Sequence, residues 1–356
     1  MTLLRRHALV IGAALVAALF VLAGRVSLGA AARAIDVDLL LVLFALLVTV
    51  EILRASAWLD LAVAATVTRF HRTRSFAAAL IVFTGALAAL VTNDVALFVV
   101  IPFTVVASRF SDFDLEDAVV LEVIASNLLG CLTPLGNPQN LFVFHRSGWS
   151  AGSFVMTMLP FVAFCDLGLA CALPLLGRSR PMTRTEVTLP PRNNAAALAG
   201  AACFALVLLE IARVAPAWPA ALAALIAGAF FLRRRFFATD LSIVPLFLFA
   251  FVIVAGLRTF GAVRADIYWT SIGLSQVISN VPATVLLAPF ANGDWRTLLY
   301  GVNAGGCGTI IASLANLLGW RIYVRESGRD PRFFRRLMVI NFAFLAWAAA
   351  GGWLLR

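Results

Sequence analysis

The chain has 356 residues, of which 62% are hydrophobic and 13% are charged, and it carries a formal net charge of +10 at pH 7. Its apolar residues form long blocks, which is the composition of a membrane domain rather than of a soluble one. All of its basic side chains are arginines, and the absence of lysine excludes a Walker A nucleotide loop and a Schiff-base enzyme.

The first predicted elements are two membrane-spanning helices, over His7–Gly24 and Val37–Leu53. Arg5 and Arg6 precede the first helix, so the positive-inside rule places the N-terminus in the cytoplasm. The first apolar run lacks a convincing small-residue cleavage site, and we expect a retained helix rather than a signal peptide. Because the arginines lie in loops as topology signals, the expected partner is a lipid bilayer and not a nucleic acid.

A hairpin is predicted over 76–108, where Thr92, Asn93 and Asp94 interrupt a long apolar stretch. Each half is too short to cross a hydrocarbon core of about 30 Å. We therefore expect a re-entrant hairpin that has this polar triplet at its tip.

A broken helix is predicted over 118–145, because the segment from Thr133 to Asn140 interrupts the next apolar stretch. Two prolines and a glycine in that segment predict a helix that unwinds at membrane depth. A spanning helix over Gly152–Leu176 completes this half of the chain.

The second half repeats this order of elements. Its predicted elements are three helices, a hairpin, a broken helix and a last helix, over Ala195–Ile211, Pro219–Leu232, Ile243–Leu257, 265–291, 296–320 and Phe334–Leu355. The hairpin is interrupted at Ser279 and Asn280, and the broken helix between Gly305 and Ser313.

The two halves align without gaps at both features. The hairpins align with Asn93 on Asn280 and Thr92 on Ser279, and the broken helices with Thr133 on Thr309, Asn127 on Asn303, Gly130 on Gly306, Cys131 on Cys307 and Asn140 on Asn316. Because an odd number of crossings separates them, we predict two inverted repeats, 1–192 and 193–356, in an all-α polytopic membrane protein. Inverted repeats with interrupted segments in corresponding places are typical of secondary transporters, whose binding site lies near the membrane midplane.

The interruptions contain the candidate site residues, because unwound backbone and small polar side chains can bind ions inside a membrane. The predicted substrate-binding residues are Thr92, Asn93, Thr133, Pro134, Ser279, Asn280 and Thr309. The predicted ion-coupling residues are Asp94, Gly136, Asn137, Asn140, Asn303, Gly306, Ser313 and Asn316. We predict no catalytic residue, no resident cofactor and no metal other than Na⁺ as a coupling ion.

Asp94 is the most informative acid, because an ionised carboxylate at this depth costs about 2.5–3.5 kcal/mol and usually has a functional reason. It is a candidate proton carrier or Na⁺ ligand. The alternative is a structural role as the N-cap of the descending helix. Four other acids have no counterpart in the other repeat, and we expect them to pair with arginine or to snorkel, namely Glu51, Glu122, Asp166 and Glu210.

Four segments resemble the ion transporter superfamily, which includes arsenite permeases, citrate and dicarboxylate transporters and a class of Na⁺/H⁺ antiporters. They are Thr-Asn-Asp-Val-Ala-Leu at 92–97, Thr-Pro-Leu-Gly-Asn-Pro-Gln-Asn at 133–140, Ser-Asn-Val-Pro-Ala at 279–283 and Asn-Ala-Gly-Gly-Cys-Gly-Thr at 303–309. The resemblance implies a scaffold domain and a moving transport domain, often in a homodimer. It also implies that substrate binds between the hairpin tips and that cations bind at the hairpin and broken-helix loops.

In the dicarboxylate branch the tips resemble Ser-Asn-Thr, and the third position departs from that pattern here at Asp94 and Val281. An ionised Asp94 would repel a carboxylate unless it is protonated or bound to a cation. The Asn-Asp tip is closer to the arsenite permease pattern, whose substrate is largely uncharged.

We therefore predict a secondary active transporter in a bacterial inner membrane, which moves a small anion or an arsenite-like solute and is coupled to H⁺ or Na⁺. The alternative within this class is a Na⁺/H⁺ antiporter. A membrane-embedded enzyme is the hypothesis from another class, and the sequence contains no His-Glu-x-x-His motif or paired aspartate motif to support it.

Overall fold

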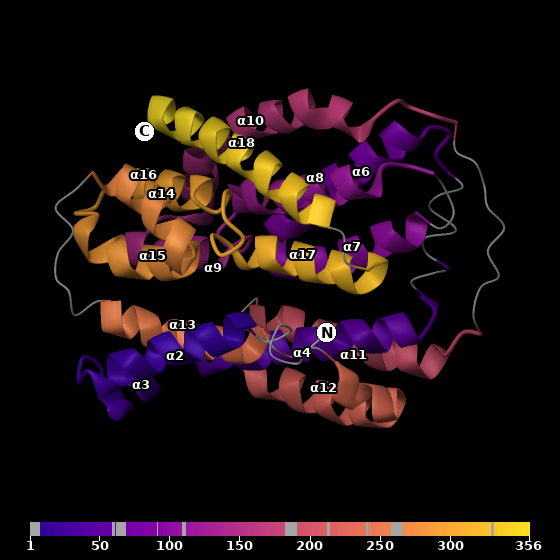
Figure 1. Ribbon diagram of the computed structural model, residues 1–356, viewed down its shortest axis with the longest axis horizontal. Helices are drawn as coiled ribbons and strands as arrows, with labels where there is room; N and C mark the ends of the chain where they lie inside the picture. The colour runs from indigo at the N-terminus through magenta and orange to yellow at the C-terminus, as the bar shows by residue number, and fades with distance from the viewer. Residues whose placement is uncertain are drawn as a thin grey trace. The chain divides into compact units, whose positions relative to one another are not determined.

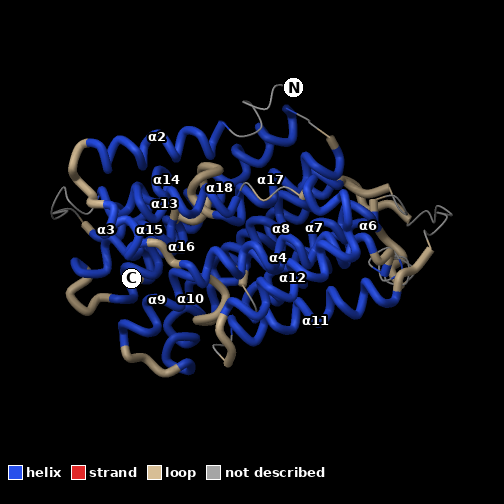
Figure 2. The backbone as a smooth tube through the Cα atoms, turned by 90° about the horizontal axis from the view of Figure 1, so that it is seen from below, coloured by secondary structure: helices blue, strands red, loops and turns tan. Residues whose placement is uncertain are grey.

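The computed structural model describes residues 8–58, 61, 69–90, 92–108, 112–181, 191–211, 214–239, 241, 243–257, 266–328 and 331–356. Within these ranges the regular secondary structure is entirely helical (Figure 2). The β-type pairing there is an isolated bridge between Arg72 and Pro181, which belongs to no strand. Three helical segments are long and apolar enough to cross a membrane, namely Thr73–Leu90, Ala151–Leu176 and Pro331–Leu355. The predicted class, an all-α polytopic membrane protein, is confirmed.

The chain divides into two compact units, and neither unit is one of the predicted repeats. One unit combines Met1–Trp58 with Pro191–Ala262, and the other combines Leu59–Pro190 with Val263–Arg356. Each unit therefore takes one segment from each half of the chain. The repeat boundaries at 1–192 and 193–356 remain a prediction about sequence, not a description of these units.

The first unit contains apolar helices that pack through small residues. Its helices are α2 Ala8–Leu22, α3 Leu28–Ala34, α4 Val37–Ala55, α11 Asn194–Ile211, α12 Ala217–Leu232, η3 Arg233–Ala238 and α13 Ile243–Leu257 (Figure 1). Helix α4 packs against α11 and α12, and α13 packs against α2 and α3. Gly200 and Gly228 face Leu53 and Val48 of α4, where a Cβ would collide with those side chains. These glycines permit the close approach of the helices.

The second unit contains both predicted hairpins and both predicted broken helices. Its helices are α6 Thr73–Leu90, α7 Asn93–Ala107, α8 Leu115–Leu128, η1 Gly130–Leu132, α9 Pro138–Ser147, α10 Ala151–Ala172, η2 Leu173–Leu176, α14 Ile267–Ile278, α15 Asn280–Leu287, η5 Ala288–Phe290, α16 Trp295–Ala304, α17 Leu314–Ser327 and α18 Pro331–Leu355. Helix α8 packs against α6, α7 and α17, and α14 packs against α15 and α16.

The hairpins are formed by α6 with α7 and by α14 with α15, and the two helices of each pair pack against each other. One expectation about them is wrong. Helix α6 has 18 residues and meets the length and hydropathy of a membrane span, because it begins at Thr73 and so includes a turn before the apolar stretch. The second limb of this hairpin, α7, has 15 residues and is short, as expected, and the limbs of the second hairpin have 12 and 8 residues. The first residue of the predicted second hairpin, 265, lies outside the described residues.

Both predicted interruptions appear as unwound segments between helices. The first broken helix consists of α8, the short η1 and α9, with 133–137 unwound between η1 and α9. The second consists of α16 and α17, with 305–313 unwound between them. The first interruption is three residues shorter than predicted, because Pro138 begins α9 as its N1 residue. Proline is favoured there, since an N1 residue needs no backbone N–H.

Candidate functional site

Each hairpin tip is bound to the unwound segment of the broken helix that follows it. The backbone N–H of Asn93 donates to the Gly136 carbonyl at 2.8 Å, and the backbone N–H of Asn280 donates to the Ala312 carbonyl at 2.9 Å. These are aligned positions in the two halves of the chain. The first turn of α7 and that of α15 are thus fixed beside a helix break.

A threonine in each break makes a second connection to its hairpin. The Thr133 hydroxyl donates to the Ala89 carbonyl, and the Thr309 hydroxyl donates to the Gln276 carbonyl at 2.8 Å. Each threonine oxygen also accepts a backbone N–H from within its own break, at 3.2 and 3.1 Å. Both hydroxyls are therefore committed to holding the break against the last turn of α6 or α14.

The end of α8 is joined to the start of α17 through buried side chains. Asn127 donates to the Asn316 side-chain oxygen at 2.9 Å. The Asn127 oxygen accepts from the Ser313 hydroxyl at 2.9 Å and from the Asn93 amide at 3.2 Å. One asparagine thus connects the first hairpin tip, the first broken helix and the second broken helix.

The end of α16 is joined to the start of α9 in the same manner. Asn303 donates to the Asn140 side-chain oxygen at 2.8 Å, and its own oxygen accepts from Asn137 at 3.2 Å and from Gln139 at 3.1 Å. Asn303 aligns with Asn127, and Asn137 aligns with Ser313. We call these two sets of bonds together the asparagine clasp, defined by Asn127, Asn140, Asn303 and Asn316.

The clasp also satisfies the backbone carbonyls that the helix breaks leave open. Asn140 donates to the carbonyls of Cys131 and Thr133 at 2.9 and 3.1 Å. Asn316 donates to the carbonyls of Gly306 and Thr309 at 2.9 and 3.0 Å. Unpaired buried carbonyls cost free energy, so these amides stabilise the unwound segments.

Asp94 does not cap its helix, and the alternative role considered for it is wrong. The N-cap of α7 is Thr92, whose hydroxyl accepts the Val95 N–H at 3.3 Å. Asp94 lies in the first helical turn, is 6% exposed, and its Oδ1 has no hydrogen-bond partner within the described residues. Asn137 is also buried and its Oδ1 is likewise unpartnered there. Two buried oxygens are thus left open at the first tip and the first break.

The remaining predicted site residues lie at the same tips and breaks. Pro134 is buried in the first break, and a Cβ on Gly306 would lie 3.0 Å from the Asn280 amide nitrogen. A Cβ on Gly136 would collide with the Gly130 carbonyl, so the chain needs glycine for the close approach of the break to itself. Ser279 has a φ of +73° and its hydroxyl caps no helix.

Three residues of the site were not among the predicted residues. Gln276 donates to the carbonyls of Gly305 and Cys307 at 2.9 and 3.0 Å, and its oxygen accepts the Thr309 N–H at 2.8 Å. Gln139 and Asn127 belong to the network described above. Asn127 is an aligned asparagine, so the repeat was a usable signal for it. Gln276 aligns with Ala89 and gave no such signal.

The expectation that the other intramembrane acids pair with arginine or snorkel holds for Glu51 and fails for Glu122. Glu51 pairs with Arg54 at 4.0 Å, as expected. Glu122 is fully buried, its Oε1 is hydrogen-bonded to the Thr104 hydroxyl at 2.6 Å, and no ion pair joins it to an arginine within the described residues. Its expected pairing is therefore wrong, because α8 is enclosed by other helices and the side chain cannot reach the interface. Asp166 is exposed along α10.

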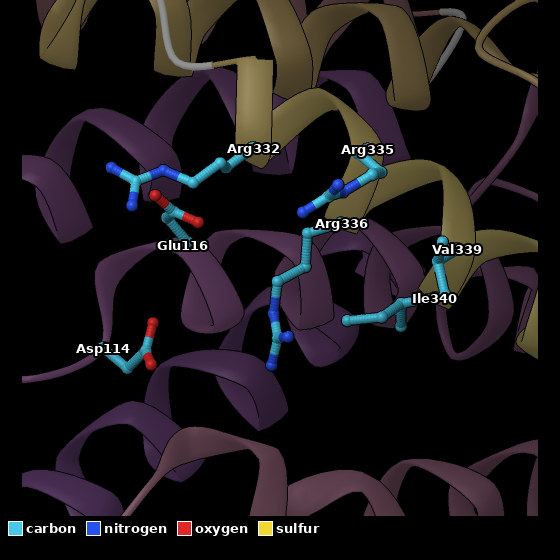
Figure 3. A pocket seen from close by; sticks show the side chains of 7 residues that line it. All are labelled: Asp114, Glu116, Arg332, Arg335, Arg336, Val339 and Ile340. Carbon is cyan, nitrogen blue, oxygen red and sulfur yellow. The ribbon is translucent and has the colours of Figure 1, made fainter.

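One pocket of the second unit lies away from the tips and breaks, at the starts of α8 and α18 (Figure 3). Its volume is about 450 Å³, and its lining residues are Asp114, Glu116, Arg332, Arg335, Arg336, Val339 and Ile340. Arg336 forms a two-pronged ion pair with the buried Asp117, one prong measuring 2.7 Å. Burial raises the pKa of the neighbouring Asp114 above its usual range. The ion pair fixes α18 to α8 and is separate from the clasp.

Comparison with known proteins identifies the family. Residues 1–294 match a family model described as a citrate transporter. The chain belongs to the citrate transporter family. The chain is 33% identical over 319 residues to an uncharacterized transporter of Methanocaldococcus jannaschii, covering 85% of this chain and 84% of that protein. It is 30% identical over 338 residues to the inner membrane protein YbiR of Escherichia coli, covering 90% and 88%.

A shorter part of the chain is similar in sequence to the 46 kDa membrane protein of Mycobacterium leprae. The identity is 27% over 145 residues, which cover 40% of this chain and 34% of that protein. Family and relatives together establish a multi-pass membrane transporter and confirm the resemblance to the ion transporter superfamily. The arsenite permease pattern at the first tip finds no counterpart among these names.

Proposed function

We propose that this member of the citrate transporter family is a secondary active transporter. It moves a small anion or an arsenite-like solute by alternating access, and an H⁺ or Na⁺ gradient drives the transport. The observation that carries the proposal is the joining of both hairpin tips and both helix breaks in one hydrogen-bonded network of the second unit. Secondary transporters place their binding sites at such breaks.

The cargo binds at the hydroxyls of Thr92 and Ser279. Both residues are partly exposed, and both stand at hairpin tips. The Thr92 oxygen accepts one hydrogen bond, and within the described residues its O–H group has no acceptor, while the Ser279 hydroxyl donates only a long 3.4 Å hydrogen bond to the Asn280 side-chain oxygen. Hydroxyl donors that are unengaged or only weakly engaged, beside the N-termini of α7 and α15, suit an anion or a polar hydroxide.

The coupling cation binds near Asp94 and Asn137. Their buried, unpartnered oxygens lie on the two segments that the bond between Asn93 and Gly136 holds together. Oxygen ligands of this kind suit Na⁺, and a carboxylate also suits H⁺. Three of the other predicted ion-coupling residues, Asn140, Asn303 and Asn316, are occupied by the clasp, so we assign them to the frame that positions the site.

The family description makes citrate the first cargo to test. A carboxylate cargo and an ionised Asp94 repel each other, and a cation bound at Asp94 removes that repulsion. The cation is then required for cargo binding, which is the basis of symport. An uncharged hydroxide such as arsenite would need no such neutralisation.

We place the protein in a bacterial inner membrane with its N-terminus in the cytoplasm, as a homodimer. The name of the Escherichia coli relative and the arginine-rich loops support the membrane and the orientation. The dimer rests on the family resemblance alone.

The test is uptake of labelled citrate, succinate or arsenite into proteoliposomes under an imposed Na⁺ gradient or pH gradient. We expect uptake of one cargo to rise at least tenfold under one gradient. Asp94→Asn, which removes the charge but not the shape, should abolish the gradient dependence. Asp112→Asn is the matched control, because Asp112 forms an exposed ion pair with Arg180 and lies outside the site.

A Na⁺/H⁺ antiporter is the second candidate, and buried Asp94 and Glu122 favour it. In that case added Na⁺ would dissipate a pH gradient without any cargo, as a fluorescent pH indicator inside the vesicles would report. No cargo uptake, together with no Na⁺-dependent pH change, would contradict both functions.

A further inference from the structure

Glu122 is a fully buried acid in the middle of α8, and the proposed site does not use it. It lies five residues before Asn127 of the clasp, which corresponds to about 7.5 Å along the helix axis. The aligned position in the second half is Leu298, so the acid belongs to the first half only.

The hydrogen bonds around Glu122 suit a protonated carboxyl group. The Thr104 oxygen lies 2.6 Å from Oε1 of Glu122 and 3.0 Å from the Val100 carbonyl. A hydroxyl has one hydrogen and can donate it to only one of these acceptors. If Glu122 holds the proton, it donates to Thr104, and Thr104 donates to Val100, so that every contact is a hydrogen bond.

The second carboxyl oxygen gives an independent indication. Oε2 of Glu122 is buried and has no hydrogen-bond partner within the described residues. A buried carboxylate with one oxygen left unpaired is more costly than a buried neutral acid. The neutral form is therefore the one that this enclosure favours.

No charged group of the packed helices compensates Glu122. Helix α17 packs closely against α8 at Gly319, where an added Cβ would contact Val123, the residue next to Glu122, and Ile101 of α7. Helix α7 contacts Glu122 through Thr104. The other ionisable residues on α8 and the elements packed against it are Arg74, Asp94, Glu116, Asp117, Cys131, Cys165, Asp166, Cys171, Arg296, Tyr300, Arg321, Tyr323, Arg325, Glu326, Arg332, Arg335 and Arg336. Within the described residues, no ion pair or hydrogen bond joins any of them to Glu122.

We propose that Glu122 is a proton-binding site of the transport cycle, which takes up one H⁺ when its carboxylate is protonated and returns it when the carboxyl group ionises. The inference rests on the proposed function and names H⁺ as a coupling ion at a site separate from Asp94. Thr104 is a positioning residue, because it orients the carboxyl group without contacting cargo.

The first test is infrared spectroscopy of the purified protein at neutral pH, since a protonated carboxylic acid has a carbonyl stretch that a carboxylate lacks. We expect Glu122→Gln to remove one such band and Thr104→Val to shift it, because the hydrogen bond to the group is lost. The control Asp112→Asn should leave the band in place. An unchanged band in both Glu122→Gln and Thr104→Val would overturn the proposal.

The second test compares two transport readouts in proteoliposomes. With citrate as the probe, we expect Glu122→Gln to lower pH-driven net uptake at least tenfold and to lower citrate exchange much less, because exchange needs no net movement of protons. Equal losses of both would assign Glu122 to cargo binding or folding and overturn the proposal. If the wild-type protein transports no cargo, the proposed function fails, and the infrared result still decides whether Glu122 holds a proton.

Discussion

The two helix breaks share one pattern of hydrogen bonds and differ in the further contacts that hold each of them. In both, an asparagine before the break is joined to the helix after the other break, and a threonine inside the break donates to the last turn of its hairpin limb. The second break is additionally held by Gln276, whereas the first has Ala89 at that position and relies on the close backbone packing of Gly136.

The two hairpin tips differ in the same sense. Thr92 is extended and caps α7, whereas Ser279 has a positive φ and provides no cap for α15. The aligned asparagines thus fix where the tips and breaks lie, while the residues that differ set how firmly each is held. We infer that the second tip, with its strained and uncapped serine, is the less stable of the two.

The largest expected effect tests the equivalence of the two halves of the clasp. Asn303→Ala leaves the polar groups of Asn137, Gln139 and Asn140 unpaired, and Asn127→Ala does the same to Asn93, Ser313 and Asn316. We expect each change to destabilise the protein by about 3 kcal/mol, since buried unpaired groups are costly. Melting temperatures in detergent should fall by similar amounts. A loss in only one variant would break the comparison.

The next effect tests the additional reinforcement of the second break. Gln276→Ala removes the donor to the Gly305 and Cys307 carbonyls and the acceptor of the Thr309 N–H. We expect about 2 kcal/mol of destabilisation, because the site is half-buried and water can replace part of the bonding. Gln139→Ala, which removes one bond to Asn303, is the matched control and should cost about 1 kcal/mol.

A smaller effect separates the two tips. Thr92→Ala removes the N-cap of α7 and should lower the free energy of unfolding by about 1 kcal/mol. Ser279→Ala removes no cap, so its effect on stability should be within about 0.5 kcal/mol. Equal losses of melting temperature in the two variants would show that the tips do not differ in capping.

The smallest expected effect has the opposite sign. Ser279→Gly places the residue that best tolerates a positive φ at the second tip, and we expect stability to rise by about 0.5 kcal/mol. The matched change Thr92→Gly should not stabilise, because Thr92 has an extended backbone. Thermal unfolding of both variants measures the difference, and a loss of stability in Ser279→Gly would contradict the strain at this tip.

The sequence by itself determined the membrane class, both broken helices and the aligned polar positions. Long apolar blocks require helices in a bilayer, and two prolines and a glycine at 134–138 prevent a continuous one. The gapless alignment also places Asn127 and Asn303 at corresponding positions.

Only the tertiary structure decided which polar groups are used up and which remain free. The sequence treats the asparagines at 137, 140, 303 and 316 alike, but partners 163 and 189 residues away satisfy three of them, while the side-chain oxygen of Asn137 has no partner within the described residues. Burial without a charged partner is likewise a property of packing, so the expectation that Glu122 would pair with arginine or snorkel missed its place beside Thr104, where no ion pair reaches it within the described residues. Hydrogen bonding and desolvation depend on neighbours in space, and neither is encoded in local spacing.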